Sequence, residues 1–175
     1  NLGGGNVTTI VNNAADAELS GVELEFTAQI TTGLSGFLNY GYLDAEFNDF
    51  TVSDDAGNPV DNSDLELRNA PEHTAAAGLD YVLALGFGEL GVHYNYWWRD
   101  EYHTILNNDP VGLVDSGGFH NASIDLSFGE HYRISVYGRN IGDERYARVV
   151  QIPDLSSWGN YNPPEHYGVE LIAEF

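Results

Sequence analysis

The sequence predicts an all-β protein whose antiparallel strands span a membrane as part of a β-barrel. Three observations predict it. Apolar and polar residues alternate in about seven segments, and the connections between these segments alternate between short and long. The last segment keeps this alternation up to its final aromatic residue. No run approaches the roughly 20 apolar residues of a membrane-spanning helix, so the sequence excludes a helical membrane protein.

The first two predicted strands lie on either side of a short turn. Strand Ser20–Ile30 alternates small or polar residues with the apolar residues Val22, Leu24, Phe26, Ala28 and Ile30. After the turn Thr31–Gly36, the strand Phe37–Phe47 places on one face Leu38, Tyr40 and Tyr42. The short segment Val7–Val11 is a possible eighth strand ahead of them.

The third and fourth predicted strands are also joined by a short turn. Strand Glu72–Leu83 has on one face Ala75, Ala77, Leu79 and Tyr81. The turn Ala84–Gly88 leads to the strand Glu89–Asp100, which carries on one face Leu90, Val92, Tyr94, Tyr96 and Trp98. Their other faces carry mainly small, amide and charged residues, with Trp97 as an aromatic exception.

The last three predicted strands complete the pattern. Strand Phe119–Phe128 is joined to His131–Ile141 through the two-residue turn Gly129–Glu130. The terminal strand Glu165–Phe175 carries on one face Tyr167, Val169, Leu171, Ala173 and Phe175. A soluble protein rarely ends inside a complete amphipathic strand, because chain termini usually fray.

Three long polar connections, Asn48–Asn69, Glu101–Gly118 and Gly142–Pro164, alternate with the short turns. Bacterial outer-membrane barrels place short turns at the periplasm and long loops outside the cell. The apolar faces then contact lipid and the polar faces line the interior. Aromatic residues near strand ends fit the two membrane interfaces, and we expect this role for Tyr40, Tyr42, Tyr81, Tyr96, Trp98, Tyr167 and Phe175.

Composition limits the function. The net charge of −21 and pI near 4.1 exclude nucleic-acid binding, because phosphates require a basic surface. The acidity suits a hydrated outer surface and contact with lipopolysaccharide through divalent ions. Cysteine is absent, so thiol and disulfide chemistry are absent too. The chain opens at Asn1 without Met or signal peptide, and we expect a processed chain or a piece of a longer protein.

Catalytic and metal-binding patterns are weak. His120 and Ser123 fall on opposite faces of a strand, so they cannot form a triad with Asp125. His93 is expected to be a wall residue of the interior. Loop carboxylates offer oxygens for calcium, but their spacing does not match the twelve-residue calcium motif; they are Asp54, Asp55, Asp61 and Asp64. We therefore expect no enzyme activity, catalytic residue, metal or cofactor.

Four segments carry a family resemblance: Asn12–Glu25, Leu67–Thr74, Tyr137–Tyr146 and Pro163–Val169. In this order they resemble the carboxy-terminal third of the barrel of TonB-dependent outer-membrane receptors. The resemblance implies the carboxy-terminal part of a larger, 22-stranded barrel, with the plug domain and amino-terminal strands outside this chain. One departure is Pro164-Glu165, where the family often has Arg after its Pro.

The resemblance also implies a function. The family imports scarce nutrients such as ferric siderophores, cobalamin or glycans, and TonB supplies the energy through the amino-terminal part; the nutrient expected for this receptor is a ferric siderophore. The implied partners are outer-membrane lipid, lipopolysaccharide, the barrel assembly machinery, and the remaining strands and plug of the receptor. The assembly machinery would read Tyr167, Val169, Leu171 and Phe175. The candidate ligand-binding residues, with groups suited to an anionic or planar ligand, are Arg145, Arg148, Gln151, Trp158, Asn160 and Tyr161.

Three alternatives remain. A small self-contained outer-membrane barrel with a structural or adhesion role needs an eighth strand and a packed interior. An outer-membrane enzyme needs a convergent catalytic set, which the motifs do not provide. A soluble ligand-binding barrel would pack the same apolar faces into a core.

Overall fold

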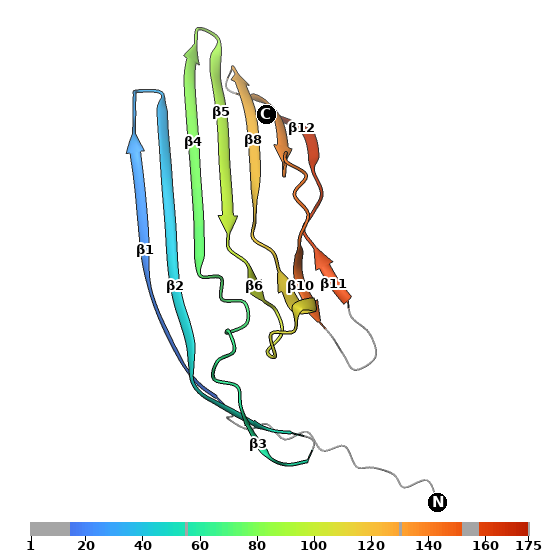
Figure 1. Cartoon of the computed structure of the whole chain (residues 1–175). Coiled ribbons are helices and arrows are strands. Elements are labelled where there is room, and N and C mark those ends of the chain that lie inside the picture. The colour runs from blue at the N-terminus through green and yellow to red at the C-terminus, as the bar shows by residue number, and fades with distance from the viewer. Residues whose placement is uncertain (1–14, 55, 130, 152–157, 175) are drawn as a thin grey trace, which may run out of the picture.

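The computed structural model describes residues 15–54, 56–129, 131–151 and 158–174. Seven long antiparallel strands lie side by side in chain order, so the sheet is a meander (Figure 1). They are β1 (Ala15–Gln29), β2 (Leu34–Ser53), β4 (His73–Leu85), β5 (Gly88–Arg99), β8 (Gly117–Phe128), β9 (Tyr132–Arg139) and β12 (His166–Ala173). The predicted antiparallel all-β fold with about seven strands is confirmed.

The connections lie at two different ends of the sheet. The short turns between β1 and β2, β4 and β5, and β8 and β9 lie at one end, and β12 runs toward this end (Figure 1). The long connections lie at the other end, which we call the long-loop end. Among the described residues, no helix is long and apolar enough to cross a membrane.

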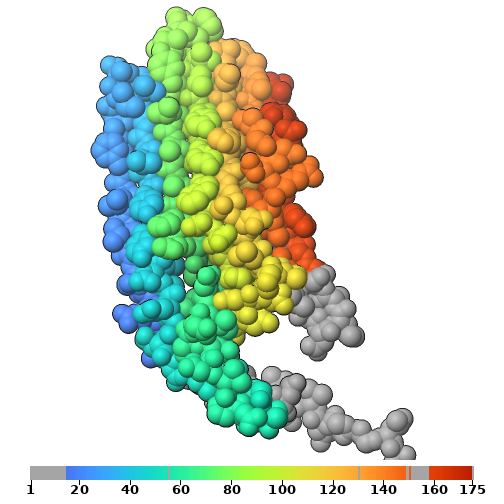
Figure 2. Space-filling model, in the orientation of Figure 1, coloured from blue at the N-terminus to red at the C-terminus, as the bar shows by residue number. Residues whose placement is uncertain are grey.

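Strand register separates the sheet into two chemically different faces. On the apolar face, Leu24 pairs with Tyr40 and Leu90 pairs with Leu126. On the polar face, one residue further along the same two strands, Glu25 pairs with Asn39. Figure 2 shows the strands from β1 to β12 as one continuous curved wall.

The sheet has no hydrophobic core on its apolar face in the described part of the chain. Phe26 is 64% exposed and Leu171 is 73% exposed, although both lie in well-paired strands. The buried hydrophobic residues of the described chain are instead Phe50, Val114 and Tyr146, at the long-loop end. A contiguous apolar face of this kind is stable only when an apolar environment covers it.

Several strands extend beyond their predicted limits, and β1 and β2 extend furthest. β1 begins at Ala15 rather than Ser20, and β2 ends at Ser53 rather than Phe47, so the start of the predicted loop Asn48–Asn69 is wrong. Backbone pairing continues past a bulge at Asp16/Ala17 to the pair Ala15 and Phe50. The bulge and the polar residues of this extension interrupt the amphipathic pattern on which the prediction relied.

The long connections contain ordered structure that the sequence pattern did not predict. The short strand β3 (Pro59–Asp61) pairs with β2. In the second connection β6 (Tyr102–His103) pairs with β7 (Leu113–Val114) after the 3-10 turn Pro110–Gly112. In the third, β10 (Ala147–Gln151) pairs with β11 (Trp158–Tyr161). The possible strand Val7–Val11 and the terminal Phe175 lie outside the described residues.

Candidate functional site

The three long connections contact one another and form one structural unit. We call residues 54–72 the first loop, 100–116 the second loop and 140–165 the third loop, and their described residues together the loop cluster. The first loop meets the second, and the second meets the third. This continuity makes the cluster the candidate ligand-binding surface.

The side chain of Asn108 joins the second loop to the first. Its Oδ1 accepts a hydrogen bond from the backbone N of Glu66 at 2.6 Å, and its Nδ2 donates to the Glu66 carbonyl at 3.1 Å. The backbone N of Asn69 also donates to the carbonyl of His103 at 2.7 Å. Asn69 and Asn108 have φ angles of 57° and 50°, which asparagine adopts more readily than most residues. The two loops are therefore fixed by both backbone and side-chain bonds.

Two hydroxyl groups join the second loop to β10 in the third loop. The Tyr102 hydroxyl donates to the carbonyl of Arg148 at 2.9 Å. The Thr104 hydroxyl lies 3.0 Å from the carbonyl of Val150 and also accepts from the Val150 backbone N at 3.3 Å. Thr104 is buried, so its two bonds to Val150 are partly shielded from water, whereas the bond of Tyr102 is exposed.

Arg99, at the end of β5, lies between the second and third loops. Its side chain is buried at 5% exposure, and its guanidinium carbon lies 4.3 Å from the ring centroid of Tyr102 and 4.5 Å from that of Tyr146. Its Nη1 donates to the carbonyls of Asp100 at 2.9 Å and Asp115 at 3.3 Å. Burial raises the pKa of the Tyr146 hydroxyl above its usual value.

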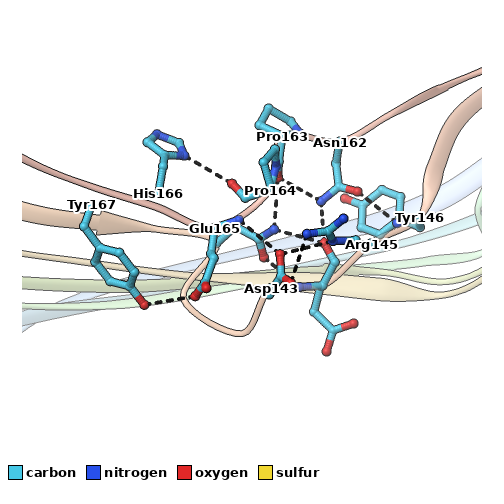
Figure 3. A network of polar contacts seen from close by, with 11 residues as sticks. Asp143, Arg145, Tyr146, Asn162, Pro163, Pro164, Glu165, His166 and Tyr167 are labelled. Carbon is cyan, nitrogen blue, oxygen red and sulfur yellow. Dashed lines mark hydrogen bonds and ion pairs between the residues drawn. The ribbon is translucent and has the colours of Figure 1, made fainter.

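Asn162 holds the turn that opens the third loop (Figure 3). Its side chain is buried, its Oδ1 accepts from the backbone N of Tyr146 at 2.9 Å, and its Nδ2 donates to the Glu144 carbonyl at 2.6 Å. Asn140 donates to the same carbonyl at 2.9 Å and to the Pro163 carbonyl at 3.0 Å. The turn is thus tied to the segment that enters β12.

Asp143 strengthens the same turn (Figure 3). Arg145 donates to its carboxylate, with Nη2 3.2 Å from Oδ2, and the backbone N of Glu165 donates to Oδ1 at 3.2 Å. These bonds, the one from Arg145 first, hold the pKa of the Asp143 carboxyl below its usual value. We call the contacts of Asn140, Asp143, Asn162 and their partners the turn network.

Residues 1–141 match a protein-family model described as the TonB dependent receptor-like beta-barrel. The match covers most of the 175 residues and includes the first six long strands down to Arg139. The chain belongs to this family.

Two solved structures resemble this TonB-dependent receptor barrel. The ferric yersiniabactin uptake receptor FyuA of Yersinia pestis has a TM-score of 0.78 and 23% identity, over 93% of this chain and 24% of its own. The siderophore receptor PiuA of Acinetobacter baumannii has a TM-score of 0.71 and 19% identity, over 90% of this chain and 22% of its own. At these identities the likeness establishes the fold. The chain therefore spans about a quarter of the length of either receptor.

In this receptor barrel, most of the predicted ligand-binding residues fall on one hairpin. Arg148 and Gln151 belong to β10, and Trp158, Asn160 and Tyr161 belong to β11. The register pairs Gln151 with Trp158, and Trp158 and Tyr161 are 52% and 66% exposed. The side chain of Gln151 lies outside the described part. Arg145 lies before the hairpin, and its guanidinium forms an ion pair with Asp143.

The predicted interfacial aromatics that the structure describes lie on the apolar face, and Phe175 lies outside the described residues. Register aligns Tyr40 with Ala75 and Trp98, Tyr42 with His73, Tyr81 with Val92, Tyr96 with Ala77, and Tyr167 with Gly138. Two histidines that the prediction did not include join them. The Tyr40 hydroxyl lies 2.9 Å from His73 Nδ1, and the Tyr96 ring stacks on the His120 ring at 4.5 Å between centroids.

Among the residues that the structure describes, no group of three or more His, Asp or Glu side chains is arranged to hold a metal ion. Asp54 and Asp61 instead accept bonds within the first loop, from Asn58 and Ser63 respectively; Asp55 lies outside the described residues. His93 lies on the polar face between two carboxylates, 2.6 Å from Asp80 and 3.5 Å from Asp125.

The sequence prediction did not identify Arg99, Tyr102 and Tyr146 as parts of the site. Arg99 ends an aromatic-rich strand at the long-loop end, and this was the one local signal available. Tyr146, the second aromatic neighbour of Arg99, is distant in the sequence, so the contact between them can be seen only in the folded structure.

Proposed function

We propose that this chain is the carboxy-terminal part of the wall of an outer-membrane receptor that takes up a ferric siderophore by TonB-energised active transport. Membership of the TonB-dependent receptor-like barrel family is the observation that carries the proposal. The two solved relatives, one named for ferric yersiniabactin uptake and one as a siderophore receptor, suggest the nutrient.

The two faces of the sheet support a location in the outer membrane of a Gram-negative bacterium. The apolar face has no protein layer over it in the described chain, and lipid would supply the apolar cover that it needs. The aromatics Tyr40, Tyr96 and Trp98 on this face suit a membrane interface. The polar face would line the interior.

Strand edges support a wider barrel. In the described residues β1 and β12 each pair on one side only, with β2 and β9 respectively. Unpaired backbone groups in lipid are very costly, so further strands of the same receptor would complete a 22-stranded wall. The plug domain, and TonB through it, would act inside that wall.

The exposed apolar side chains of β12 support recognition by the barrel assembly machinery. Tyr167, Val169 and Leu171 are exposed on one face of this strand. With Phe175 they would form the signal that the machinery reads. Lipopolysaccharide would surround the acidic long-loop end, bridged by divalent ions.

The loop cluster would capture the ligand outside the cell. The β10–β11 hairpin offers Arg148, Trp158, Asn160 and Tyr161, which suit a planar or anionic chelate through charge-assisted bonds and stacking. The ties to the second loop support a hairpin that is held in place before ligand arrives.

Two measurements test the proposal separately. Denaturing electrophoresis and peptide mass spectrometry of an outer-membrane fraction should find residues 158–163 in a polypeptide several times larger than 19.2 kDa. A native species near that mass would instead support the small self-contained barrel.

The second measurement is iron uptake. A strain without the full receptor should lose energy-dependent uptake of radioactive iron from a ferric siderophore, and restoring the gene should restore it only when TonB is present. Unchanged iron uptake from every siderophore tested, with loss of cobalamin or glycan uptake, would replace the siderophore by that nutrient.

A further inference from the structure

We propose that Arg99 is a positioning residue for ligand binding: it holds the second and third loops together against the wall and thereby sets the position of the β10–β11 hairpin. The inference rests on the proposed function, because the hairpin carries the candidate ligand-binding side chains. We call Arg99 with the rings of Tyr102 and Tyr146 the arginine clamp.

Arg99 carries a buried positive charge. In the described chain no carboxylate lies within ion-pair distance of Arg99, although the protein is strongly acidic. A buried cation is costly unless other groups replace water around it. Two aromatic faces and the carbonyls of Asp100 and Asp115 do so here. The buried side chain is therefore stable only while both rings stay in place.

Arg99 joins the second loop to the third through the rings of Tyr102 and Tyr146. Tyr102 belongs to the second loop, and its hydroxyl holds the backbone of Arg148 in β10. Tyr146 belongs to the third loop, and Asn162 holds its backbone N. The guanidinium of Arg99 thus contacts one residue in each loop. Tyr102 is bonded to β10, and Tyr146, which precedes β10, is bonded to Asn162, which follows β11. Loss of Arg99 would loosen both at once.

Tyr146 also connects the arginine clamp to the strands of the wall. Tyr146 packs on the Phe119 ring of β8 at 5.3 Å, and Phe119 stacks on the Trp97 ring of β5 at 5.7 Å. Gly117 leaves room for this, since a Cβ there would lie 2.9 Å from Tyr146 Cδ1. The clamp therefore rests on a row of rings on the polar face, and this row fixes the loops relative to the strands.

Arginine suits this position better than lysine does. A planar guanidinium stacks on two rings and donates to carbonyls in its own plane, whereas an ammonium does neither as well. The Nη2 atom of Arg99 is buried without a partner in the described residues. An unsatisfied buried donor costs stability. The arrangement is thus better explained by positioning of the loops than by maximal stability.

The test uses the full receptor in detergent, with Arg99→Met and Arg99→Lys variants. Arg139→Met is the matched control, because Arg139 is an exposed arginine on the same face, 5.8 Å from the Tyr137 ring. Hydrogen exchange by mass spectrometry should show exchange in residues 101–116 and 145–151 rising about tenfold or more in Arg99→Met. Arg99→Lys should fall between Met and the parent. Arg139→Met should leave both segments unchanged.

Exchange in these loops needs no ligand, so the outcome is independent of the transported nutrient. Unchanged exchange in Arg99→Met, or an equal rise throughout the barrel strands, would overturn the clamp. Loss of loop protection in a receptor that transports no siderophore would leave the clamp standing and refute the nutrient. In a receptor that does bind a ferric siderophore, Arg99→Met should weaken binding mainly through faster dissociation.

Discussion

Replacement of Asn162 by alanine should open the third loop while leaving the barrel strands intact. Asn162 is 5% exposed, and its side chain contacts the backbone at Tyr146, Glu144 and Pro163. Alanine cannot replace any of these bonds. The Glu144 carbonyl keeps the bond from Asn140, so the backbone N of Tyr146 is the group that loses its side-chain partner.

The magnitude follows from this count. A buried backbone donor left without a partner costs about 1–3 kcal/mol, and each lost neutral hydrogen bond about 1 kcal/mol. We expect the third loop to lose about 3 kcal/mol of local stability, which corresponds to roughly a hundredfold increase in its opening equilibrium. The sheet itself shares none of these bonds, so its stability should be unaffected.

Hydrogen exchange of the full receptor provides the assay, read on peptides that cover residues 140–151 and 158–165. Asn160→Ala is the control, because Asn160 is exposed on the same hairpin and such substitutions usually change stability by less than about 0.5 kcal/mol. If Asn162→Ala and Asn160→Ala gave the same exchange, the turn network would not be what holds this loop.

Three further predictions concern the same molecule. The carboxyl of Asp143 has a lowered pKa, so its bonds from Arg145 and Glu165 stabilise the loop above about pH 4 and are lost as pH falls through the lower folded value; the protection of the loop, which compares its exchange rate with the intrinsic amide exchange rate at the same pH, should fall on acidification, and Asp143→Asn should remove this dependence. Asn108→Ala should loosen the first loop from the second, although the backbone bond from Asn69 to His103 still joins them, and this should be seen as faster exchange at residues 62–68 with little change in β10. Val136→Arg, in the middle of the apolar face, should cost about 2–4 kcal/mol if lipid covers that face, and reduce folded receptor in the outer membrane.

The strands could be predicted from sequence because each face imposes its own chemistry on alternate residues. Val22 and Leu24 lie on the exposed apolar face, and Glu23 lies on the other, as the pattern indicates. The pattern fails where β1 and β2 continue into the long-loop end. There the continuation of β2 to Ser53 depends on backbone pairing and on the packing of the Phe47 ring against the Phe50 ring, at 4.7 Å between centroids, and neither contact has a period in the sequence.

The site was less accessible to sequence analysis, and the reason is distance along the chain. Aromatic and charged residues of the third loop could be identified as candidates by type alone. The contact of Arg99 with Tyr146, by contrast, requires the second and third loops to fold together. The segment Tyr137–Tyr146 was noticed for its resemblance to a family motif, but only the structure gives its Asn140 and Asp143 a bonding role.

These contacts together suggest why an exposed hairpin on a long loop can be a specific binding surface. A free loop would lose conformational entropy on capturing a ligand, and that loss would weaken binding. Here the base of the hairpin is held by Tyr102, Thr104 and Asn162, while Trp158 and Tyr161 at its second strand stay exposed. Because the hairpin backbone is already held in place, less conformational entropy is lost when a ligand binds, and the exposed aromatic side chains remain accessible to that ligand. On this reasoning Asn162→Ala and Arg99→Met should both weaken ligand binding although neither residue is one of the candidate ligand-binding side chains, and Trp158→Ala should weaken it without changing loop exchange.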